Sequence, residues 1–409
     1  MMRTFPQTIC CMSKDAPREC PSLWAELLLF LPIIRNTLLI RQRSDAANYT
    51  GIDVWALVDI AALGLCAITL FSHLNEIPWK KIQESCLRWW FLYYILCMFS
   101  VLWAFEGSSS SYILYRSFSM LLMSLYIFWI MSQYSTAERA FNAMVGYIWW
   151  IMFLGLLGNI RLGSLHTNSY SCSAAVIACM MLAINRFETI TISRGKWWLI
   201  TALICLVLGT SGGSNVAFLC GVIFLTSLNK KGISIVRVAL LCLLAWICCE
   251  FLLSPMIKLL FPGKNLEGIT SGTGRFKMWQ MYWEAWEYRP WLGYGFAVGE
   301  RAGAQLNYVY TLSAHNGFLS VLINTGLCGW FFFGIFLIKF IYGLFKAVTN
   351  EERYAIAVLT GVVVILINNN SVPVIGSIWS PLATIALLLI SFYTLFLQHN
   401  LKETVCDVI

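Results

Sequence analysis

The sequence predicts an all-α, polytopic membrane protein, and three observations carry that prediction. Of its 409 residues, 59% are hydrophobic and only 12% are charged, whereas a soluble domain has about 45–50% apolar and roughly 25% charged residues. The apolar residues come in runs close to the roughly 20 residues that a spanning helix needs. The Lys and Arg residues fall between alternate runs. Disorder, a secreted disulfide scaffold and a nucleic-acid-binding domain are thereby excluded, so no nucleic-acid partner is expected.

About twelve apolar segments are candidate spanning helices. The first is interrupted by Glu26 and Arg35, and the seventh and eighth are short and joined by the Gly-rich turn Thr210–Ser214. A turn of this composition ends one helix and begins the next. The segments lie near residues 22–40, 54–74, 88–105, 111–131, 140–158, 170–185, 197–210, 213–229, 235–254, 316–345, 353–370 and 373–397.

The net charge of +8 orients the bundle. Lys and Arg collect in cytoplasmic loops, and twelve spans with both termini in the cytoplasm place the cations of the short loops on that side, with one local exception. That exception is the loop with Arg41 and Arg43, and the long outer loop 254–314 carries further cations of its own. Lys14 and Arg18 precede an apolar run without a small-residue cleavage site, so no cleaved signal peptide is expected. The cytoplasmic cations are Lys14, Arg18, Lys80, Lys81, Arg88, Arg186, Arg194, Lys196, Lys230, Lys231, Arg237, Lys346 and Arg353.

The chain divides into three parts. Residues 1–253 hold helices 1–9, residues 254–314 form the only long extramembrane segment, and residues 315–409 hold helices 10–12 and a short cytoplasmic tail. The topology puts the 254–314 loop on the outer side, and long loops in compact architectures are usually functional. Within it, Phe276 to Tyr288 is rich in Trp and Tyr, which predicts an amphipathic helix at the interface.

The 15 cysteines indicate neither a metal site nor redox chemistry. Ten of them lie within apolar runs, where Cys behaves as a small hydrophobic side chain. No CxxC pair and no Cys–His cluster with zinc-ligand spacing occurs. We therefore expect structural cysteines, no metal and no cofactor.

The first candidate site motif is the Gly-rich run Ser271–Arg275, followed by Trp279. Glycines beside an Arg allow backbone N–H groups and a guanidinium to converge on a phosphate. The alternative is an ordinary Gly-rich turn that leads into an interfacial helix. The residues alone leave both interpretations open.

The second motif is the run Pro290–Phe296, in which Gly and aromatic residues alternate around Tyr294. Such a turn presents flat apolar faces that suit a lipid interface or a sugar ring. The alternative is a loop that packs back onto the bundle.

The third motif is His315-Asn316, at the outer mouth of the tenth span. An imidazole titrates near neutrality and can take a proton from a hydroxyl. The alternative is an interfacial histidine at a helix start. Arg116, one turn inside the fourth span, either snorkels to the outer face or meets an anionic headgroup; charges in spans are functional candidates.

Together these motifs resemble the signature of the O-antigen ligase-like superfamily, which includes O-antigen ligases and polymerases of O-antigen, capsule and exopolysaccharide. The match extends over about Gly272 to Gly329. The resemblance implies a GT-C-like bundle of the bacterial inner membrane, with the loop between helices 9 and 10 in the periplasm. It also implies a metal-independent, inverting glycosyltransferase that uses an undecaprenyl-diphosphate-linked glycan as donor.

The resemblance implies two catalytic residues. Arg275 would hold the diphosphate leaving group, and His315 would orient or deprotonate the acceptor hydroxyl. The substrate-binding residues expected beside them are Asn316, Arg116, Gly274, Trp279, Tyr294, Ser211 and Arg161.

The chain departs from the family pattern in two places. Family members usually carry a second Arg or Lys after a Ser-rich turn, but Gly209–Asn215 contains no cation. Either Arg116 or Arg161 replaces it in space, or the neutral turn binds phosphate through backbone N–H groups. The family pattern also has a Glu nine residues after the His, where this chain has Asn324.

Four functions remain open at this point. The first is a polymerase that joins lipid-linked repeat units, with a chain-length regulator as a further candidate partner. The second is a ligase that transfers the glycan to lipid A–core, and the third is transfer to another acceptor, such as a protein or cell-wall anchor. The fourth is a transporter of lipid-linked sugars, for which paired repeats and broken helices near the midplane are expected; the sequence has no evident repeat.

Overall fold

The computed structural model describes residues 20–38, 54–105, 110–162, 168–187, 194–209, 211–229, 232–233, 275–301 and 314–398. These residues are mostly helical, as the sequence predicts. The strands among them are a pair of two-residue antiparallel strands, β1 (Leu228–Asn229) and β2 (Gly232–Ile233). The helices are α1 (Leu23–Thr37), α2 (Val54–Ser72), α3 (Trp79–Glu84), α4 (Leu87–Phe99), α5 (Ser110–Ser132), α6 (Ala137–Leu162), α7 (Asn168–Phe187), α8 (Gly195–Leu208), α9 (Gly212–Ser227), α12 (Arg275–Tyr288), α14 (Gly317–Thr349), α15 (Ala355–Asn368) and α16 (Pro381–Phe392).

Helices occupy eleven of the twelve predicted segments, and the segment near 235–254 lies outside the described residues. Three helices are long and apolar enough to cross a membrane, namely α5, Ala137–Ile160 within α6, and α14. The other apolar helical stretches in the described ranges, such as Ala56–Ser72 within α2 and Tyr170–Arg186 within α7, have 10–17 residues. This composition is that of a membrane protein, and the count of twelve spans stays a prediction.

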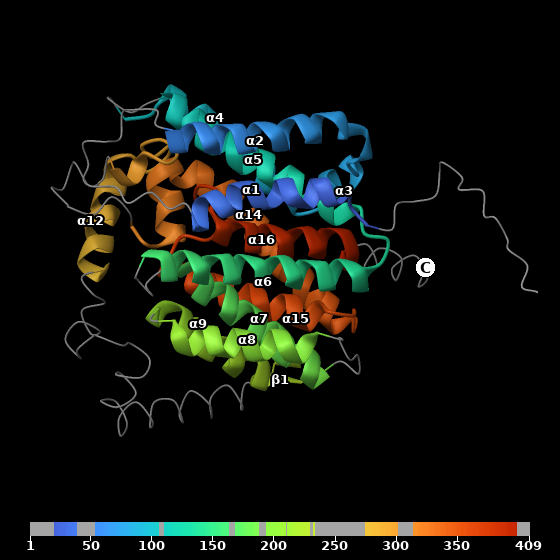
Figure 1. Cartoon of the computed structure of the whole chain (residues 1–409). Coiled ribbons are helices and arrows are strands. Elements are labelled where there is room, and N and C mark those ends of the chain that lie inside the picture. Colours follow the sequence, from blue (N-terminus) through green and yellow to red (C-terminus); the bar gives the residue numbers. More distant parts are fainter. Residues whose placement is uncertain are drawn as a thin grey trace, which may run out of the picture.

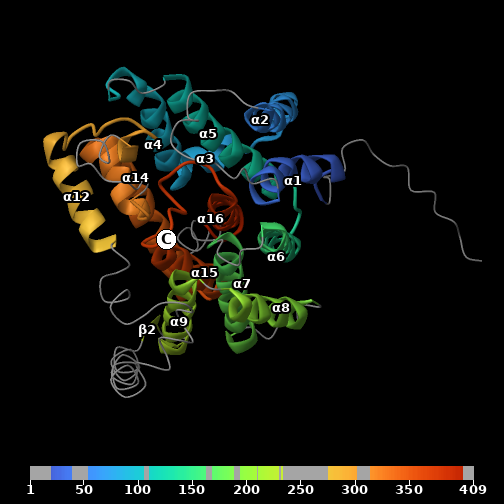
Figure 2. The ribbon, with the colours of Figure 1, turned by 60° about the vertical axis from the view of Figure 1, so that its left-hand side comes forward.

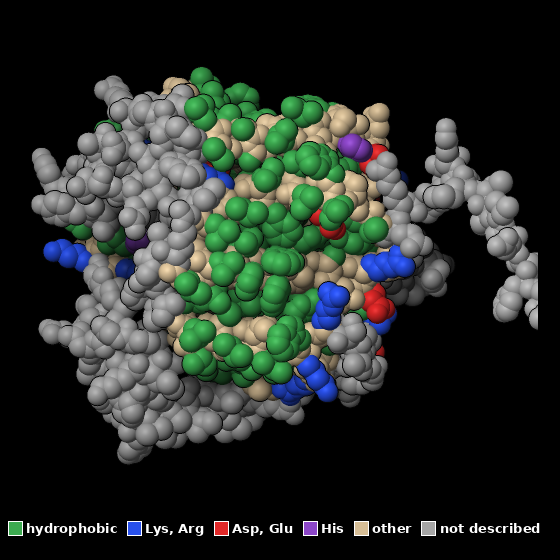
Figure 3. Space-filling model, in the orientation of Figure 1, with side chains coloured by type: hydrophobic (Ala, Val, Ile, Leu, Met, Phe, Trp, Pro, Cys, Tyr) green, Lys and Arg blue, Asp and Glu red, His purple; other side chains and the backbone are tan. Residues whose placement is uncertain are grey.

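The long helices lie side by side in a bundle, and α12 lies across one end of it (Figure 1). At the opposite end lies α3, which carries Lys80 and Lys81 (Figure 1). Figure 3 shows hydrophobic side chains over the middle of the bundle and Lys and Arg side chains toward both of its ends. In the interior, α7 packs against α6, α8, α9 and α15. Helix α12, which begins at Arg275, and α3, which carries two of the predicted cytoplasmic cations, therefore lie at opposite ends of the bundle.

The last helix begins later than the sequence predicts. The segment near 373–397 was expected to be helical throughout, but α16 starts at Pro381, with Ser380 as its cap. The Ser380 hydroxyl accepts a hydrogen bond from the amide of Ala383 at 3.1 Å, and proline is well suited to the first helical position. Upstream, the Asn369 side chain accepts hydrogen bonds from the amides of Val374 and Ile375, which holds this stretch as a turn.

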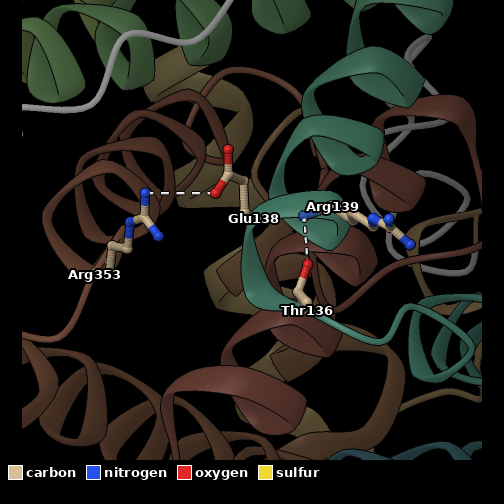
Figure 4. Close-up of polar contacts among 4 residues, drawn as sticks. All are labelled: Thr136, Glu138, Arg139 and Arg353. Carbon is tan, nitrogen blue, oxygen red and sulfur yellow. Dashed lines mark hydrogen bonds and ion pairs between the residues drawn. The ribbon is translucent and has the colours of Figure 1, made fainter. Parts of the chain in front are cut away.

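A polar contact joins the start of α6 to the turn between α14 and α15 (Figure 4). The Arg353 guanidinium lies 3.5 Å from the Glu138 carboxylate, and both side chains are about half exposed. The amide of Arg139 donates to the Thr136 hydroxyl at 3.3 Å, which helps to cap α6. Arg353 is one of the predicted cytoplasmic cations, so this contact lies on the side that we predict to be cytoplasmic.

Candidate active site

The site begins at the first turn of α14. Asn316 caps this helix, because its side-chain oxygen accepts hydrogen bonds from the amides of Phe318 and Leu319 at 3.0 and 3.1 Å. His315 precedes the cap and adopts a positive φ of 49°. That conformation is uncommon for residues other than glycine, and strained backbone of this kind clusters at functional sites. The oxygen of Asn316 is thus used by the helix, and its NH₂ group is the part suited to a ligand.

Helix α12 packs against this first turn of α14, and Figure 2 shows the two helices as neighbours. The Trp279 indole nitrogen donates to the carbonyl oxygen of Ala314 at 2.8 Å. Farther along the same face of α12, Tyr282 packs into a cluster with Leu319 and Ile323 of α14. Trp279 therefore ties α12 directly to the residue that precedes His315.

This packing brings Arg275 close to His315. Arg275 is the first residue of α12, one turn before Trp279, and it is partly buried. Burial lowers the pKa of the His315 imidazole, and the positive charge of Arg275 lowers it further. Burial also lowers the pKa of the Arg275 guanidinium, although an Arg remains charged in proteins. The site thus pairs a neutral imidazole with a cation at neutral pH.

A break in α14 explains the run Pro290–Phe296. Gly326 has a φ of +62°, and α14 is kinked at this residue, so that it consists of two helical parts. In an unbroken helix the amides of Leu327 and Cys328 would bond to the carbonyls of Ile323 and Asn324. Here those two carbonyls accept from the amides of Tyr294 and Gly295, each at 2.9 Å.

The two freed amides also bond to this loop. Leu327 donates to the carbonyl of Pro290 at 2.8 Å, and Cys328 donates to that of Trp291 at 3.0 Å. The loop thus inserts its backbone where the helix hydrogen bonds open. A β-carbon on Gly293 would lie 2.7 Å from the backbone of α14, which explains why glycine is needed there. The motif packs back onto the bundle, as the alternative interpretation expected.

Tyr294 contributes to the same packing. Its side chain is 2% exposed, and its hydroxyl donates to the carbonyl of Ala285 in α12 at 2.7 Å. Arg289 lies over its ring at 5.1 Å. These contacts connect the inserted loop to α12, and they favour a positioning role over direct contact with a sugar.

Glu300 is a residue whose role the sequence did not predict. Its carboxylate accepts a hydrogen bond from the amide of Ala314 at 3.2 Å and contacts the Ser320 hydroxyl. It therefore holds both sides of the His315 turn. The signal in the sequence was a Glu four residues after the end of the glycine–aromatic run. Nearby, the Asn324 side-chain oxygen accepts from the amide of Gly299 at 3.0 Å, so this residue fastens the same loop.

Ser211 lies on the other flank of the site, at the cap position of α9. Its hydroxyl is 3.2 Å from that of Ser214, which in turn donates to the side chain of Asn368 at 3.3 Å. The next residue, Asn369, accepts the amide of Gly317 through its backbone carbonyl at 2.8 Å. The cation-free turn is thus linked, through the end of α15, to the first residue of α14.

The remaining predicted residues are only partly described. Arg116 lies on α5 beside the rings of Tyr112 and Tyr115, at 5.1 and 5.5 Å. Arg161 is on the last turn of α6, and its side chain, like all of Gly274, lies outside the described residues. Within the described ranges, no three His, Cys, Asp or Glu side chains come together as a metal site.

The comparisons bear on this part of the chain. The family model described as O-antigen ligase matches residues 197–334, about a third of the sequence. The matched range contains the Ser211 turn, Arg275, the inserted loop and His315, so it confirms the resemblance to the O-antigen ligase-like superfamily. The match implies a glycosyl-transferring membrane enzyme of the O-antigen ligase type, with a lipid-linked glycan and an acceptor as substrates. No curated protein matches the chain.

Proposed function

We propose that this protein is an inner-membrane glycosyltransferase that polymerises undecaprenyl-diphosphate-linked repeat units on the periplasmic face. The observation that carries the proposal is the pairing of Arg275 with His315 through the Trp279–Ala314 hydrogen bond. A cation beside a neutral base matches what glycosyl transfer from a diphosphate donor requires. Polymerases also vary more in sequence than ligases do, which accommodates Asn324 and the cation-free turn of this chain.

The reaction follows from this pair. A nitrogen of the neutral His315 imidazole takes the proton of the acceptor hydroxyl, which contributes of order 10²–10⁴-fold in rate. The hydroxyl oxygen forms a bond to the anomeric carbon as the bond from that carbon to the diphosphate oxygen breaks. The electron pair leaves with the diphosphate, whose growing charge Arg275 stabilises through charge-assisted hydrogen bonds. Attack from the side opposite the leaving group inverts the anomeric configuration.

The other predicted residues have supporting roles in this proposal. Trp279 and Tyr294 position α12, and the Asn316 NH₂ group and the Ser211 turn offer hydrogen bonds to substrate. Gly274, in the predicted periplasmic loop, and Arg161, just after the predicted segment 140–158, stay proposed substrate-binding residues. Neither a metal nor a cofactor is needed by a reaction in which the leaving group already carries its charge well.

Transfer to lipid A–core is the second candidate, and the description of the matching family as O-antigen ligase favours it. The transporter alternative gains one feature, the broken helix α14. In a transporter, the backbone groups that are freed at such a break would bind the ion or the substrate. Here all four of them form hydrogen bonds with the Pro290–Phe296 loop. The break therefore supports a fixed loop rather than a transport site.

The test is transfer by the purified, full-length protein supplied with undecaprenyl-diphosphate-linked repeat units. A ladder of longer products supports the polymerase, and single additions onto lipid A–core support the ligase. Movement of substrate across vesicles without any glycosidic product contradicts both. His315→Ala and Arg275→Ala should each abolish transfer while membrane insertion is retained, and full activity in either variant removes that residue from the mechanism.

A further inference from the structure

The chain around Cys86, directly after α3, brings together ammonium groups from two helices. The Nζ of Lys81 in α3 donates to the carbonyl oxygen of Leu395 at 3.0 Å. Thr394, the residue before Leu395, interacts with the Cys86 thiol, and so does the ammonium group of Lys339 in α14. Lys81 and Lys339 therefore flank the same short stretch, at the end of the bundle where α3 lies (Figure 1).

Arg88 adds a guanidinium to the same place. It is the second residue of α4, its side chain is exposed, and its guanidinium carbon lies 5.1 Å from the centre of the Trp89 ring. The centre of the Trp89 ring in turn lies 6.1 Å from that of Phe332 in α14. Trp89 thus holds the guanidinium at the seam between α4 and α14, which pack against each other. Helices α3, α4 and α14 therefore each supply one cation.

The part of the chain that the structure describes does not neutralise these three cations. None of Lys81, Arg88 and Lys339 forms an ion pair with a described carboxylate. With the exposed Lys80, residues 79–90 hold three cations against the single carboxylate of Glu84. Burial lowers the pKa of the Lys81 ammonium, as expected for a cation that loses water without gaining an opposite charge. The group has an excess of positive charge, which a bound anion would compensate.

The position of the cations selects a lipid as the source of that anion. From Gly317 to Lys339, α14 is about 33 Å long at 1.5 Å per residue, close to the roughly 30 Å of hydrocarbon that a spanning helix crosses. Lys339 therefore lies near the membrane boundary opposite to the start of α14. Apolar side chains lead up to both outer cations, because Leu92, one turn after Arg88, is 41% exposed and Ile338, next to Lys339, is 70% exposed. An anionic headgroup with acyl chains fits such a surface.

We propose that Lys81, Arg88 and Lys339 form a binding site for an anionic phospholipid of the leaflet that we predict to be cytoplasmic. The headgroup phosphate lies between the three cations, where Arg88 offers two parallel N–H groups and each lysine a point charge. The acyl chains follow the exposed side chains of Leu92 and Ile338. Because α3 and α12 lie at opposite ends of the bundle (Figure 1), this site is separate from the candidate active site and does not depend on the proposed function.

The experiment uses the full-length protein in phosphatidylcholine nanodiscs, in which phosphatidylglycerol replaces an increasing fraction of the lipid. The unfolding temperature reports binding, because a lipid that binds only the folded state raises it. Arg88→Gln and Lys339→Gln should each weaken this stabilisation about tenfold or more in apparent affinity, as expected for the loss of one charge-assisted hydrogen bond. Lys81 is kept, because its bond to Leu395 also holds α3.

The matched control is Lys196→Gln. Like Arg88, Lys196 is an exposed cation directly before a tryptophan, on the side that we predict to be cytoplasmic. It belongs to α8, which packs on α7, so it is outside the proposed site. This variant should respond to phosphatidylglycerol as the wild-type protein does. If Arg88→Gln and Lys339→Gln respond as Lys196→Gln does, the lipid is attracted by general surface charge and the site does not exist.

The protein in pure phosphatidylcholine provides a second readout. Because the three cations repel one another, Arg88→Gln and Lys339→Gln should each unfold at the same or a higher temperature than the wild type when no anionic lipid is present. A lower unfolding temperature together with an unchanged response to phosphatidylglycerol identifies the cations as structural and overturns the proposal. Absence of transfer by the wild-type protein would refute the proposed function alone, since the lipid titration needs no turnover.

Discussion

The indole nitrogen of Trp279 lies 2.8 Å from the carbonyl oxygen of Ala314 and donates a hydrogen bond to it. This bond connects two segments that are 35 residues apart in the chain. Arg275 lies one turn before Trp279 on the same helix, and His315 follows Ala314. A single hydrogen bond therefore fixes the relative position of the cation and the imidazole.

Trp279→Phe should lower transfer about three- to tenfold, because a hydrogen bond of this kind contributes about 0.5–1.5 kcal/mol. The phenyl ring keeps most of the apolar contact with α14, so insertion and the unfolding temperature should change little. Trp283→Phe is the matched control, since Trp283 is on the same helix and 48% exposed. Equal activity of the two variants would show that the indole hydrogen bond does not position the site.

The charge of Arg275 should be visible in the pH profile of transfer. If neutral His315 is the base, kcat/KM rises with pH through the pKa of the imidazole and then levels off. Because the positive charge of Arg275 lowers that pKa, Arg275→Gln should raise it and move the rising limb of its residual activity to higher pH. Arg275→Lys keeps the charge and should leave the limb in place. An unchanged limb in Arg275→Gln would exclude His315 as the titrating base.

The helices could be predicted from the sequence, because runs of apolar residues near the spanning length have few other solutions in lipid. The contacts of the inserted loop could not. The run Pro290–Phe296 alone predicts a turn, and the run Ile323–Cys328 alone predicts part of a helix. Their pairing depends on hydrogen bonds between segments about 30 residues apart, which no local pattern encodes.

Gly326→Ala tests whether that pairing holds the site. A β-carbon at Gly326 would clash with the backbone of Trp291, and a positive φ disfavours alanine. We expect a loss of about 2 kcal/mol or more in unfolding free energy together with reduced transfer. Gly146→Ala, in the middle of α6, places its β-carbon in open space and should be neutral or stabilising. Wild-type stability and activity in Gly326→Ala would mean that the break in α14 is not required.

The candidate site was predictable in its residue types and only partly in its roles. Arg275 and His315 follow from the motif, and the structure brings them together. Asn316 and Tyr294 carry polar groups that a sequence cannot distinguish from ligand contacts, yet their oxygens bond to the protein itself. Glu300 escaped prediction because its importance arises from Ala314 and Ser320, which are 14 and 20 residues away.

A polar cluster on the predicted cytoplasmic side should affect stability without affecting transfer. The Glu26 carboxylate accepts hydrogen bonds from the hydroxyls of Tyr147 at 2.7 Å and Tyr134 at 2.9 Å, which ties α1 to α6 and to the turn between α5 and α6. Tyr147→Phe removes one donor from a partly buried carboxylate, so we expect the unfolding free energy to fall by about 1–2 kcal/mol. The rate of transfer per folded molecule should be unchanged.

The comparison for Tyr147→Phe is Glu138→Gln, which breaks the exposed ion pair with Arg353 (Figure 4). Exposed pairs contribute about 0–1 kcal/mol because water and salt screen them, so Glu138→Gln should unfold close to the wild-type temperature. The order of the two variants in thermal unfolding thus measures the effect of burial on a carboxylate contact. If Tyr147→Phe instead abolishes transfer at wild-type stability, Glu26 takes part in function, and the reacting groups are not confined to the end of the bundle that α12 covers.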